Sequence, residues 1–528
     1  MLRSSSATAI TTALVLGCSF SQPARAQEET DQRLGTVHFE TSCNEAAQRR
    51  FDRGMRYQHS FWYRASKEIF EDTLKADPQC AIAYWGIALS LLLNPFGAPL
   101  PANLEQGLAA LQKAKAIGAK TPRENEFIAA LLAFYTDYEK VDHRARLQVY
   151  LKAMEALAQH YPQDDEAQIY YALALDTAAS PADKTYANQL KAAAILEGIF
   201  KRQPQHPGVA HYLIHSYDYP PIAEKGLDAA TRYSKIAPTA PHAQHMPSHI
   251  FTRVGYWKES IAANAASVRA AKADKEYGDQ LHGQDYMVYA YLQLAQDKNA
   301  RTVIDEMATS PDAPGASFAL AASPARYMVE RGDWSGAAGL QVRPTKYPHV
   351  LAITHFARAV GAARSGKPDA AQADIAKLAE LRDKLREAKD AYWAEQVSIQ
   401  HQVASAWLLL AQGKADDALK AMSAAADAED KTEKAPVTPG PLAPARELYG
   451  AMLLERGMTK DALIAFEATL KKEPHRLGAT IGAAKAAEAM GDTGKARQHY
   501  AAAIALGEAA DPVRTEIAAA RTFMAKAN

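Results

Sequence analysis

Apolar residues recur every three or four positions from residue 46 to near the end of the chain, and the strict alternation of a half-buried strand is almost absent. Helix starts are clearly marked, as at residues 121–124, where Thr-Pro-Arg-Glu combines a capping box with proline at the first helical position. The pattern therefore predicts an all-α protein.

The helical pattern also repeats along the chain. Residues of the same kind return after 34 positions near the C-terminus: Gly450, Ala462 and Phe466 are followed by Ala484, Ala496 and Tyr500. Near the N-terminus, Gly54, Ser66 and Phe70 show the same spacings. This spacing resembles the tetratricopeptide repeat (TPR), a unit of two antiparallel helices with small residues where the helices touch. The resemblance implies a TPR-like α-solenoid, a superhelix of antiparallel helix pairs, because each unit buries its apolar face only against its neighbours.

Five parts are expected along the chain: a signal peptide (1–26), an N-terminal extended segment (27–45), an N-terminal TPR-like array with a histidine-rich groove (46–310), central TPR-like helical pairs (311–435) and a C-terminal TPR pair (436–528). The proline-rich stretch 429–445 lies at the last of these boundaries. It is either a linker between domains or a long loop inside one continuous solenoid, and the pattern does not separate the two.

The first 26 residues are typical of a cleavable secretory signal, with Arg3 near the start, an apolar stretch and the small-residue ending Ala-Arg-Ala at 24–26. We therefore expect a periplasmic or secreted protein; a lipoprotein acylated on Cys18 is the minor alternative. No other segment reaches the roughly 18 apolar residues of a membrane span. Export permits disulfides, so Cys43 and Cys80, the two cysteines left after cleavage, are expected to form one.

Composition and charge are those of an ordinary globular protein, with 48% hydrophobic and 23% charged residues. Lys and Arg together number 60, as do Asp and Glu, so the formal net charge is zero. A protein of this kind has no overall basic field to attract nucleic acid or anionic lipid. We therefore expect no nucleic-acid partner.

Six of the 16 histidines fall within residues 206–249. In the TPR register, His211 and His245 occupy one position of successive units, and His215 and His249 occupy another. The H-x-x-x-H pair is thus repeated at the TPR interval. Residues four apart lie on one face of a helix, and the resemblance to TPR implies that both pairs lie on helices that line the concave groove.

The next unit extends the histidine pattern. His282 matches the register of His242, and Asp285 matches that of the first histidine of each pair. The predicted metal ligands are His211, His215, His242, His245, His249 and His282. Asp218 and Asp285 are predicted to add a ligand or to hold a ligand histidine by its second nitrogen. Pro247 either begins a helix or kinks one, because proline inside a helix removes a backbone hydrogen bond.

The type of ligand limits the metal. Imidazole-rich sites favour copper or zinc and disfavour calcium or magnesium. By ligand count, six histidines resemble the three-plus-three arrangement of dicopper oxygen-binding centres, so copper is expected first. Zinc, with three histidines and an open water position, is the alternative. One or two ions are expected, and Arg253, Tyr286 and Tyr289 are the candidates for substrate contacts.

Three segments resemble a group of bacterial exported TPR proteins: residues 77–90 (DPQCAIAYWGIALS), 211–218 (HYLIHSYD) and 245–257 (HMPSHIFTRVGYW). The resemblance runs over most of the mature chain and brings no catalytic assignment. We expect a metal-dependent enzyme, a copper oxidase or oxygenase acting on a small molecule or peptide in the groove. The alternatives are a zinc-dependent hydrolase at the same site and a non-catalytic periplasmic adaptor that binds a peptide or protein partner. In the adaptor, the histidines only shape the groove, held by carbonyl or tyrosine hydrogen bonds.

Overall fold

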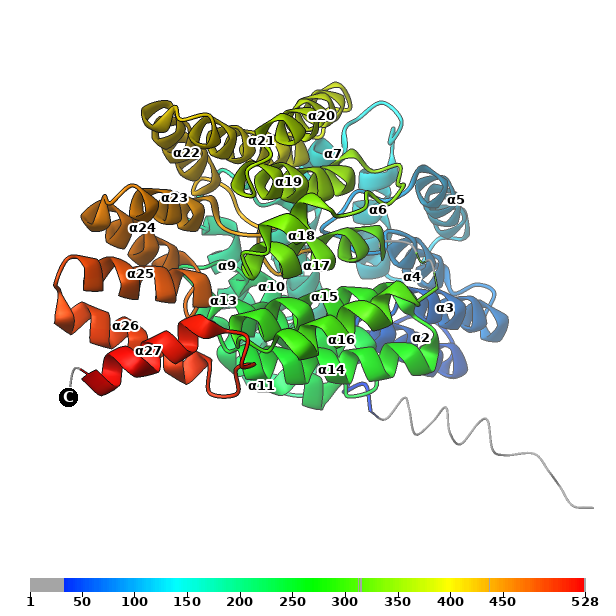
Figure 1. Ribbon diagram of the computed structural model, residues 1–528. Helices are drawn as coiled ribbons and strands as arrows, with labels where there is room; N and C mark the ends of the chain where they lie inside the picture. The colour runs from blue at the N-terminus through cyan, green and yellow to red at the C-terminus, as the bar shows by residue number, and fades with distance from the viewer. Residues whose placement is uncertain (1–32, 312, 314–315, 436, 527–528) are drawn as a thin grey trace, which may run out of the picture.

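The computed structural model describes residues 33–526 except 312, 314–315 and 436, so the predicted signal peptide and Cys18 lie outside the described residues. Within these ranges every regular element is a helix (Figure 1), which confirms the all-α prediction. The predicted cap at Thr121 is present, since its hydroxyl accepts a hydrogen bond from the backbone N–H of Glu124. In the same part of the chain, no helix is long and apolar enough to cross a membrane.

Successive helices are joined by short connections and pack against each other along the whole chain, as α2 does on α3 and α14 on α15. The first helices are α2 (Glu45–His59), α3 (Tyr63–Ala76), α4 (Ala81–Leu91), α5 (Pro101–Ile117), α6 (Pro122–Tyr135), α7 (His143–His160), α8 (Asp165–Ala178), α9 (Ala187–Arg202), α10 (Pro207–Tyr217), the 3-10 helix η1 (Ala223–Gly226), α11 (Leu227–Ile236), α12 (Pro241–His245) and α13 (Pro247–Arg253).

The remaining helices are α14 (Trp257–Asp274), α15 (Tyr277–Gln293), α16 (Asp297–Ala308), α17 (Ala316–Glu330), α18 (Trp334–Ala338), α19 (Pro348–Arg364), α20 (Pro368–Glu387), α21 (Ala391–Ala411), α22 (Ala415–Glu429), α23 (Ala445–Glu455), α24 (Thr459–Lys472), α25 (Leu477–Ala489), α26 (Thr493–Leu506) and α27 (Thr515–Lys526). Because short connections make neighbouring helices antiparallel, the chain is a TPR-like α-solenoid.

The repeat of small and aromatic residues has a direct packing cause. Phe70 of α3 lies between Gly54 of α2 and Gly86 of α4, and a Cβ added at either glycine would come within 2.7 Å of the ring. Phe466 of α24 is enclosed in the same way by one glycine of α23 and one of α25. A side chain at these glycines would push the helices apart, so their spacing is what lets three consecutive helices stack closely.

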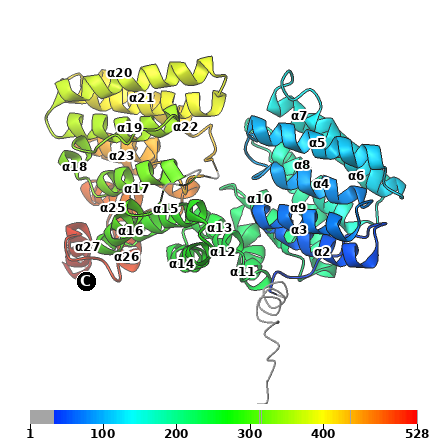
Figure 2. The ribbon, with the colours of Figure 1, turned by 90° about the vertical axis from the view of Figure 1, so that its right-hand side faces the viewer.

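Helices α10–α13 lie in the middle of the molecule. Figure 2 shows α2–α9 on one side and α14–α27 on the other. The apolar core of the first side is one continuous cluster within residues 34–251. The C-terminal helices return to the middle, where Trp257 Nε1 donates to the carbonyl of His475 at 2.8 Å and Arg476 Nη1 donates to Tyr289 Oη at 3.0 Å. These contacts hold α14 and α15 against the C-terminal part of the solenoid.

The connection between α22 and α23 also crosses the molecule. Glu433 Oε1 accepts hydrogen bonds from Lys184 Nζ at 2.9 Å and from Tyr186 Oη at 3.0 Å, both in the connection between α8 and α9. Lys434 Nζ donates to Asp218 Oδ2, just after α10, at 3.2 Å. The stretch predicted as a linker or a loop is therefore bound to the N-terminal side by charged and polar contacts.

A disulfide joins Cys43, in the segment before α2, to Cys80, at the start of α4, with a Cα–Cα distance of 5.1 Å. Replacing both cysteines with serine is expected to lower the free energy of unfolding by about 3–4 kcal/mol, because the bond closes a loop of 37 residues in the unfolded chain. Urea denaturation followed by circular dichroism measures this loss. Reduced wild-type protein is the control and should match the variant; a variant as stable as the oxidised wild type would contradict the prediction.

Candidate metal centre

The six predicted histidines meet where the two sides of the molecule join. They lie on four helices: α10 (His211 and His215), α12 (His242 and His245), α13 (His249) and α15 (His282). Pro241 and Pro247 each begin a helix, where a missing N–H leaves no hydrogen bond unmade. Pro247 therefore starts α13, and the short helix before it carries the preceding two histidines.

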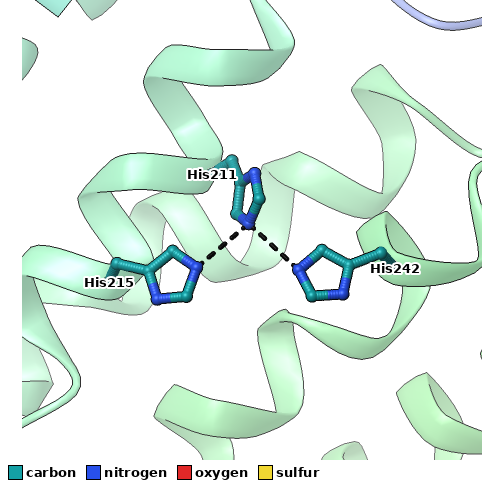
Figure 3. Close-up of side chains that lie close together, drawn as sticks. All are labelled: His211, His215 and His242. Carbon is teal, nitrogen blue, oxygen red and sulfur yellow. Dashed lines mark hydrogen bonds between the residues drawn. The ribbon is translucent and has the colours of Figure 1, made fainter. Parts of the chain in front are cut away.

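His211, His215 and His242 form the first triplet (Figure 3). Nε2 of His211 lies 3.1 Å from Nε2 of His215 and 3.2 Å from Nε2 of His242. Nδ1 of His211 donates to the carbonyl oxygen of His59 at 2.8 Å, so the proton is on Nδ1 and Nε2 keeps its lone pair. Ring nitrogens bound at about 2.0–2.1 Å in a tetrahedral site lie roughly 3.3 Å apart, which is close to these separations.

His245, His249 and His282 form the second triplet. Nε2 of His245 lies 3.0 Å from Nε2 of His249, and the ring centroid of His282 lies 4.4 Å from that of His245. His245 Nδ1 donates to Asn264 Oδ1 at 2.6 Å, and His249 Nδ1 donates to Asp218 Oδ2 at 2.9 Å. The outer nitrogens of both rings thus carry the protons, and their Nε2 lone pairs face inward, as in metal-ligating histidines.

The second triplet repeats the first one unit further along the solenoid. Each combines an H-x-x-x-H pair with one histidine of the following unit. The triplets are adjacent, with ring centroids 6.3 Å apart for His215 and His249 and 6.1 Å apart for His242 and His245. His242 and His282 are partly exposed and the other four histidines are buried, so each triplet has one member in contact with solvent.

Burial keeps these imidazoles neutral. Desolvation holds the pKa values of four histidines well below the ordinary range, and neighbouring imidazoles lower them further. The four are His211, His215, His242 and His245. Burial, with a contribution from His249, lowers the pKa of His282 to about 3. A neutral imidazole is the form that binds a metal ion, because the ligand nitrogen has to be unprotonated.

Asp218 is the charged group behind the second triplet. Besides His249 Nδ1, its carboxylate accepts hydrogen bonds from Arg253 Nε at 2.8 Å and from Lys434 Nζ at 3.2 Å. Burial alone would raise the pKa of Asp218, but the two cations outweigh it and hold this pKa well below its usual range. Asp218 can therefore hold a histidine of the site by its second nitrogen, as predicted. The histidine that it holds is His249 of α13 and not His215 of α10. Arg253, predicted to contact substrate, is paired with Asp218.

The other three predicted residues lie on α15, and one of them contacts the histidines. Tyr286 Oη is 3.5 Å from Nε2 of His249. Asp285 belongs to neither triplet; its Oδ1 accepts a hydrogen bond from a serine of α17 at 2.7 Å. Tyr289 Oη donates to Glu473 at 3.1 Å. Asp285 and Tyr289 are four residues apart, so they share a face of the helix that is turned toward α17 and the C-terminal helices.

Two phenylalanines that the sequence pattern did not single out cover the first triplet. The ring of Phe61 lies 4.2 Å from that of His211, and the ring of Phe96 lies 4.2 Å from that of His215, centroid to centroid. Phe61 has a left-handed backbone, with φ 54°, in the turn between α2 and α3. Both residues come from connections between helices, so the 34-residue register gives no sign of them.

A third group, His59, Glu166 and His206, lies behind the first triplet and is fully buried. The carboxylate of Glu166 accepts hydrogen bonds from Nε2 of His59 at 3.1 Å and from Nε2 of His206 at 2.9 Å. His206 Nδ1 accepts the backbone N–H of Val209, so its proton is on Nε2 and that nitrogen has no lone pair for a metal. These hydrogen bonds fix the position of His59, and the backbone carbonyl of His59 in turn orients His211.

Gly208→Ala is expected to displace His59 and so disturb the hydrogen bonds among His59, Glu166 and His206. The added Cβ would lie 2.4 Å from Nδ1 of His59, so His59 or α10 has to move. We expect a loss of about 1–3 kcal/mol in the free energy of unfolding through overpacking. In the control variant Gly198→Ala, on α9, the nearest atom is 3.9 Å away, and the change should stabilise by up to about 1 kcal/mol. Thermal denaturation compares the two; equal stability would contradict the packing argument.

Comparison with known proteins finds only matches of low similarity. No family model and no curated protein matches the chain. Among solved structures, the human IFIT1 dimer with PPP-AAAA is 12% identical, with 92% of this chain and 100% of that chain covered and a TM-score of 0.39. The APC/C hetero-tetramer Cut9-Hcn1 is 12% identical over 92% and 78%, with a TM-score of 0.37. The TPR domain of P58(IPK) is 13% identical over 69% and 99%, with a TM-score of 0.22. With scores this low, it is the stacked helix pairs of the chain itself that identify it as a TPR-like helical-repeat protein.

Proposed function

We propose that the chain binds two transition-metal ions, copper in preference to zinc, one at each histidine triplet. The observation that carries this proposal is the convergence of three ring nitrogens within 4.8 Å in each of two adjacent, largely buried triplets. Without an ion, the buried Nε2 lone pairs of His245 and His249 would face each other with no proton between them. Buried polar atoms without partners are costly, and a metal ion relieves that cost.

The chemistry of the ligands supports copper or zinc. Each triplet offers neutral imidazoles and neither a thiolate nor a carboxylate, a set that suits these metals and not calcium or magnesium. A bound copper pair would supply one-electron exchange and reaction with dioxygen. We therefore infer an oxidase or oxygenase first and a zinc-dependent hydrolase second.

The chain's own residues orient the ligands and control access to them. The carbonyl, amide and carboxylate groups described above hold the Nδ1 protons of His211, His245 and His249 outward and so direct Nε2 of these three rings to the centre. Phe61 and Phe96 exclude water from one side of the first triplet. His242 and His282, the partly exposed members, are the ligands that a small molecule or a peptide would reach first.

The fold and the disulfide support the remaining parts of the proposal. Helical-repeat proteins typically bind proteins or peptides on an extended concave surface, so a non-catalytic adaptor with a peptide or protein partner is the second candidate function. The Cys43–Cys80 disulfide suits an oxidising compartment. We accordingly propose that the protein is exported to the periplasm or secreted.

Metal analysis of the full mature chain, expressed in the periplasm, tests the proposal. Metal-free protein is then titrated with copper and, separately, with zinc. We expect two ions per chain, tighter binding of copper, and oxygen uptake by the copper form when a substrate is present. Two zinc ions without oxygen uptake would favour the hydrolase. A chain that binds neither metal in either experiment would remove the metalloprotein proposal and leave the adaptor.

A further inference from the structure

Tyr286 lies against the second triplet, on the same helix as His282. The two residues are four positions apart on α15, the spacing that also joins the two histidines of each H-x-x-x-H pair, so they share one face of the helix. The ring of Tyr286 lies close to the rings of all three histidines, at centroid distances of 4.8 Å for His245, 5.2 Å for His249 and 5.2 Å for His282. Tyr286 is therefore packed on the triplet, and its side chain is fully buried there.

The phenol oxygen of Tyr286 lies at the separation expected of a fourth ligand. Oη is 3.5 Å from Nε2 of His249, and this nitrogen is 3.0 Å from Nε2 of His245. Two ligands of one tetrahedral ion are roughly 3.3 Å apart, whereas a hydrogen bond usually joins atoms about 2.7–3.2 Å apart. The distance between Oη and Nε2 of His249 therefore fits two ligands of one ion better than it fits a hydrogen bond.

Binding through this oxygen requires that the ion take the place of the phenol proton. Burial, with a contribution from the charge of Asp218, raises the pKa of Tyr286 well above its usual range, so the side chain is a neutral phenol in the metal-free chain. Its hydroxyl then donates to the carbonyl oxygen of Thr438 at 3.3 Å. A bound cation reverses the effect of such surroundings, as it does for coordinating thiols. The proton passes to solvent, and the long hydrogen bond to Thr438 is lost.

The first triplet has different neighbours. Phe61 and Phe96 lie with their rings 4.2 Å from those of His211 and His215, and a phenylalanine side chain has no oxygen or nitrogen that could bind an ion. A metal site with four protein ligands is closed, and a site with three keeps a position for water or a substrate. The two triplets match in their histidines and differ in the aromatic residues packed on them.

We propose that Tyr286 Oη is the fourth ligand of the ion at the second triplet, and that a small molecule binds only to the ion at the first triplet. This inference rests on the proposed two-ion function and divides that function between the sites. The second triplet holds its ion in a complete set of protein ligands. The first triplet, whose His242 is partly exposed, is where a substrate meets the metal.

Copper(II) titration of the metal-free mature chain carrying His211→Ala tests the fourth ligand, because this variant leaves only the second triplet intact. We expect one ion per chain and a visible absorption band from phenolate-to-copper charge transfer. Tyr286→Phe in the same background should abolish the band. It should weaken copper binding at least as much as the loss of a group that orients a ligand, about 10–100-fold. Tyr291→Phe, at a half-buried tyrosine on a different face of α15, is the matched control and should keep both the band and the affinity.

Azide, a small anion that binds copper(II), tests the open position, and its own charge-transfer band reports binding. Azide should bind to the copper form of His245→Ala, which retains the first triplet. It should not bind to the copper form of His211→Ala, where Tyr286 completes the site. Adding Tyr286→Phe to His211→Ala should allow azide to bind, because the fourth position is then vacant.

Thermal denaturation of the metal-free variants establishes that each is folded. If Tyr286→Phe does not fold, the phenolate band of His211→Ala, in which Tyr286 is intact, decides the question. One copper ion in His211→Ala without this band would overturn the fourth ligand and leave the metal proposal standing. Azide binding to His211→Ala would overturn the closed second site. A chain that binds no copper would overturn both proposals, and the copper count separates this result from the others.

Discussion

Replacing His211 with alanine is expected to lower the copper content from two ions per chain to one, and replacing His245 is expected to remove the other ion. Each change deletes one of the three ring nitrogens of a triplet and leaves the opposite triplet complete. Loss of a group that only orients a ligand weakens metal binding about 10–100-fold, so loss of the ligand itself should weaken it by more than about 100-fold. Metal analysis after gel filtration gives the stoichiometry, and titration against a competing chelator gives the affinity.

The matched control is His160→Ala. His160 is exposed on α7, and its Nδ1 lies 2.9 Å from the carboxylate of Glu126. This variant should keep both ions with unchanged affinity. The double variant His211→Ala/His245→Ala should hold none. If His211→Ala retained two tightly bound ions, the first triplet would not be a metal site; if either single variant lost both ions, the triplets would not be independent.

Asp218→Ala is expected to destabilise the fold by about 3–5 kcal/mol, because it leaves two buried cations, Arg253 and Lys434, without their carboxylate. It should also weaken metal binding at the second triplet about 10–100-fold, since His249 Nδ1 loses its acceptor. Urea denaturation of the metal-free protein measures the first effect, and copper titration measures the second. Metal-free protein is used so that lost binding energy is not counted as lost stability.

Asp228→Ala is the control for the aspartate. Its carboxylate pairs with Arg232 on the surface of α11, with the aspartate side chain 72% exposed, and such pairs contribute about 0–1 kcal/mol. Asp218→Asn is the conservative variant: it keeps an oxygen acceptor for His249 and removes the charge, so metal affinity should fall less than in the alanine variant. An Asp218→Ala protein as stable as Asp228→Ala would contradict the account of the buried charges.

The helix face that carries the histidine pairs could be predicted from the sequence because the pairs follow a repeat. His211 and His215 return as His245 and His249 at the TPR interval, and residues four apart on a helix always share a face. His242 completes the first triplet and not the second, although it is only three residues from His245, because its ring nitrogen lies 3.2 Å from that of His211 on α10.

The surroundings of the histidines could not be predicted in this way. Lys434 and Asp218 are 216 residues apart in the chain, and His59 and His211 are 152 apart. Residues this far apart in the chain are not related by the helical periodicity or by the 34-residue repeat. Phe61 and Phe96 come from turns whose path depends on how the flanking helices stack. Asp285 has the register of a ligand, but its carboxylate accepts a hydrogen bond from a serine of α17 and lies in neither triplet.

By itself, the sequence determined that the chain is helical, that its helices repeat in pairs and that its histidines occur at matching positions, because helical periodicity and close helix contacts depend on residues a few positions apart or one unit apart. Only the tertiary structure decided which histidines share a triplet, which nitrogen of His211, His245 and His249 carries the proton, and which carboxylate lies behind the second triplet. These depend on hydrogen bonds between segments far apart in the chain, and such contacts exist only once the solenoid has stacked.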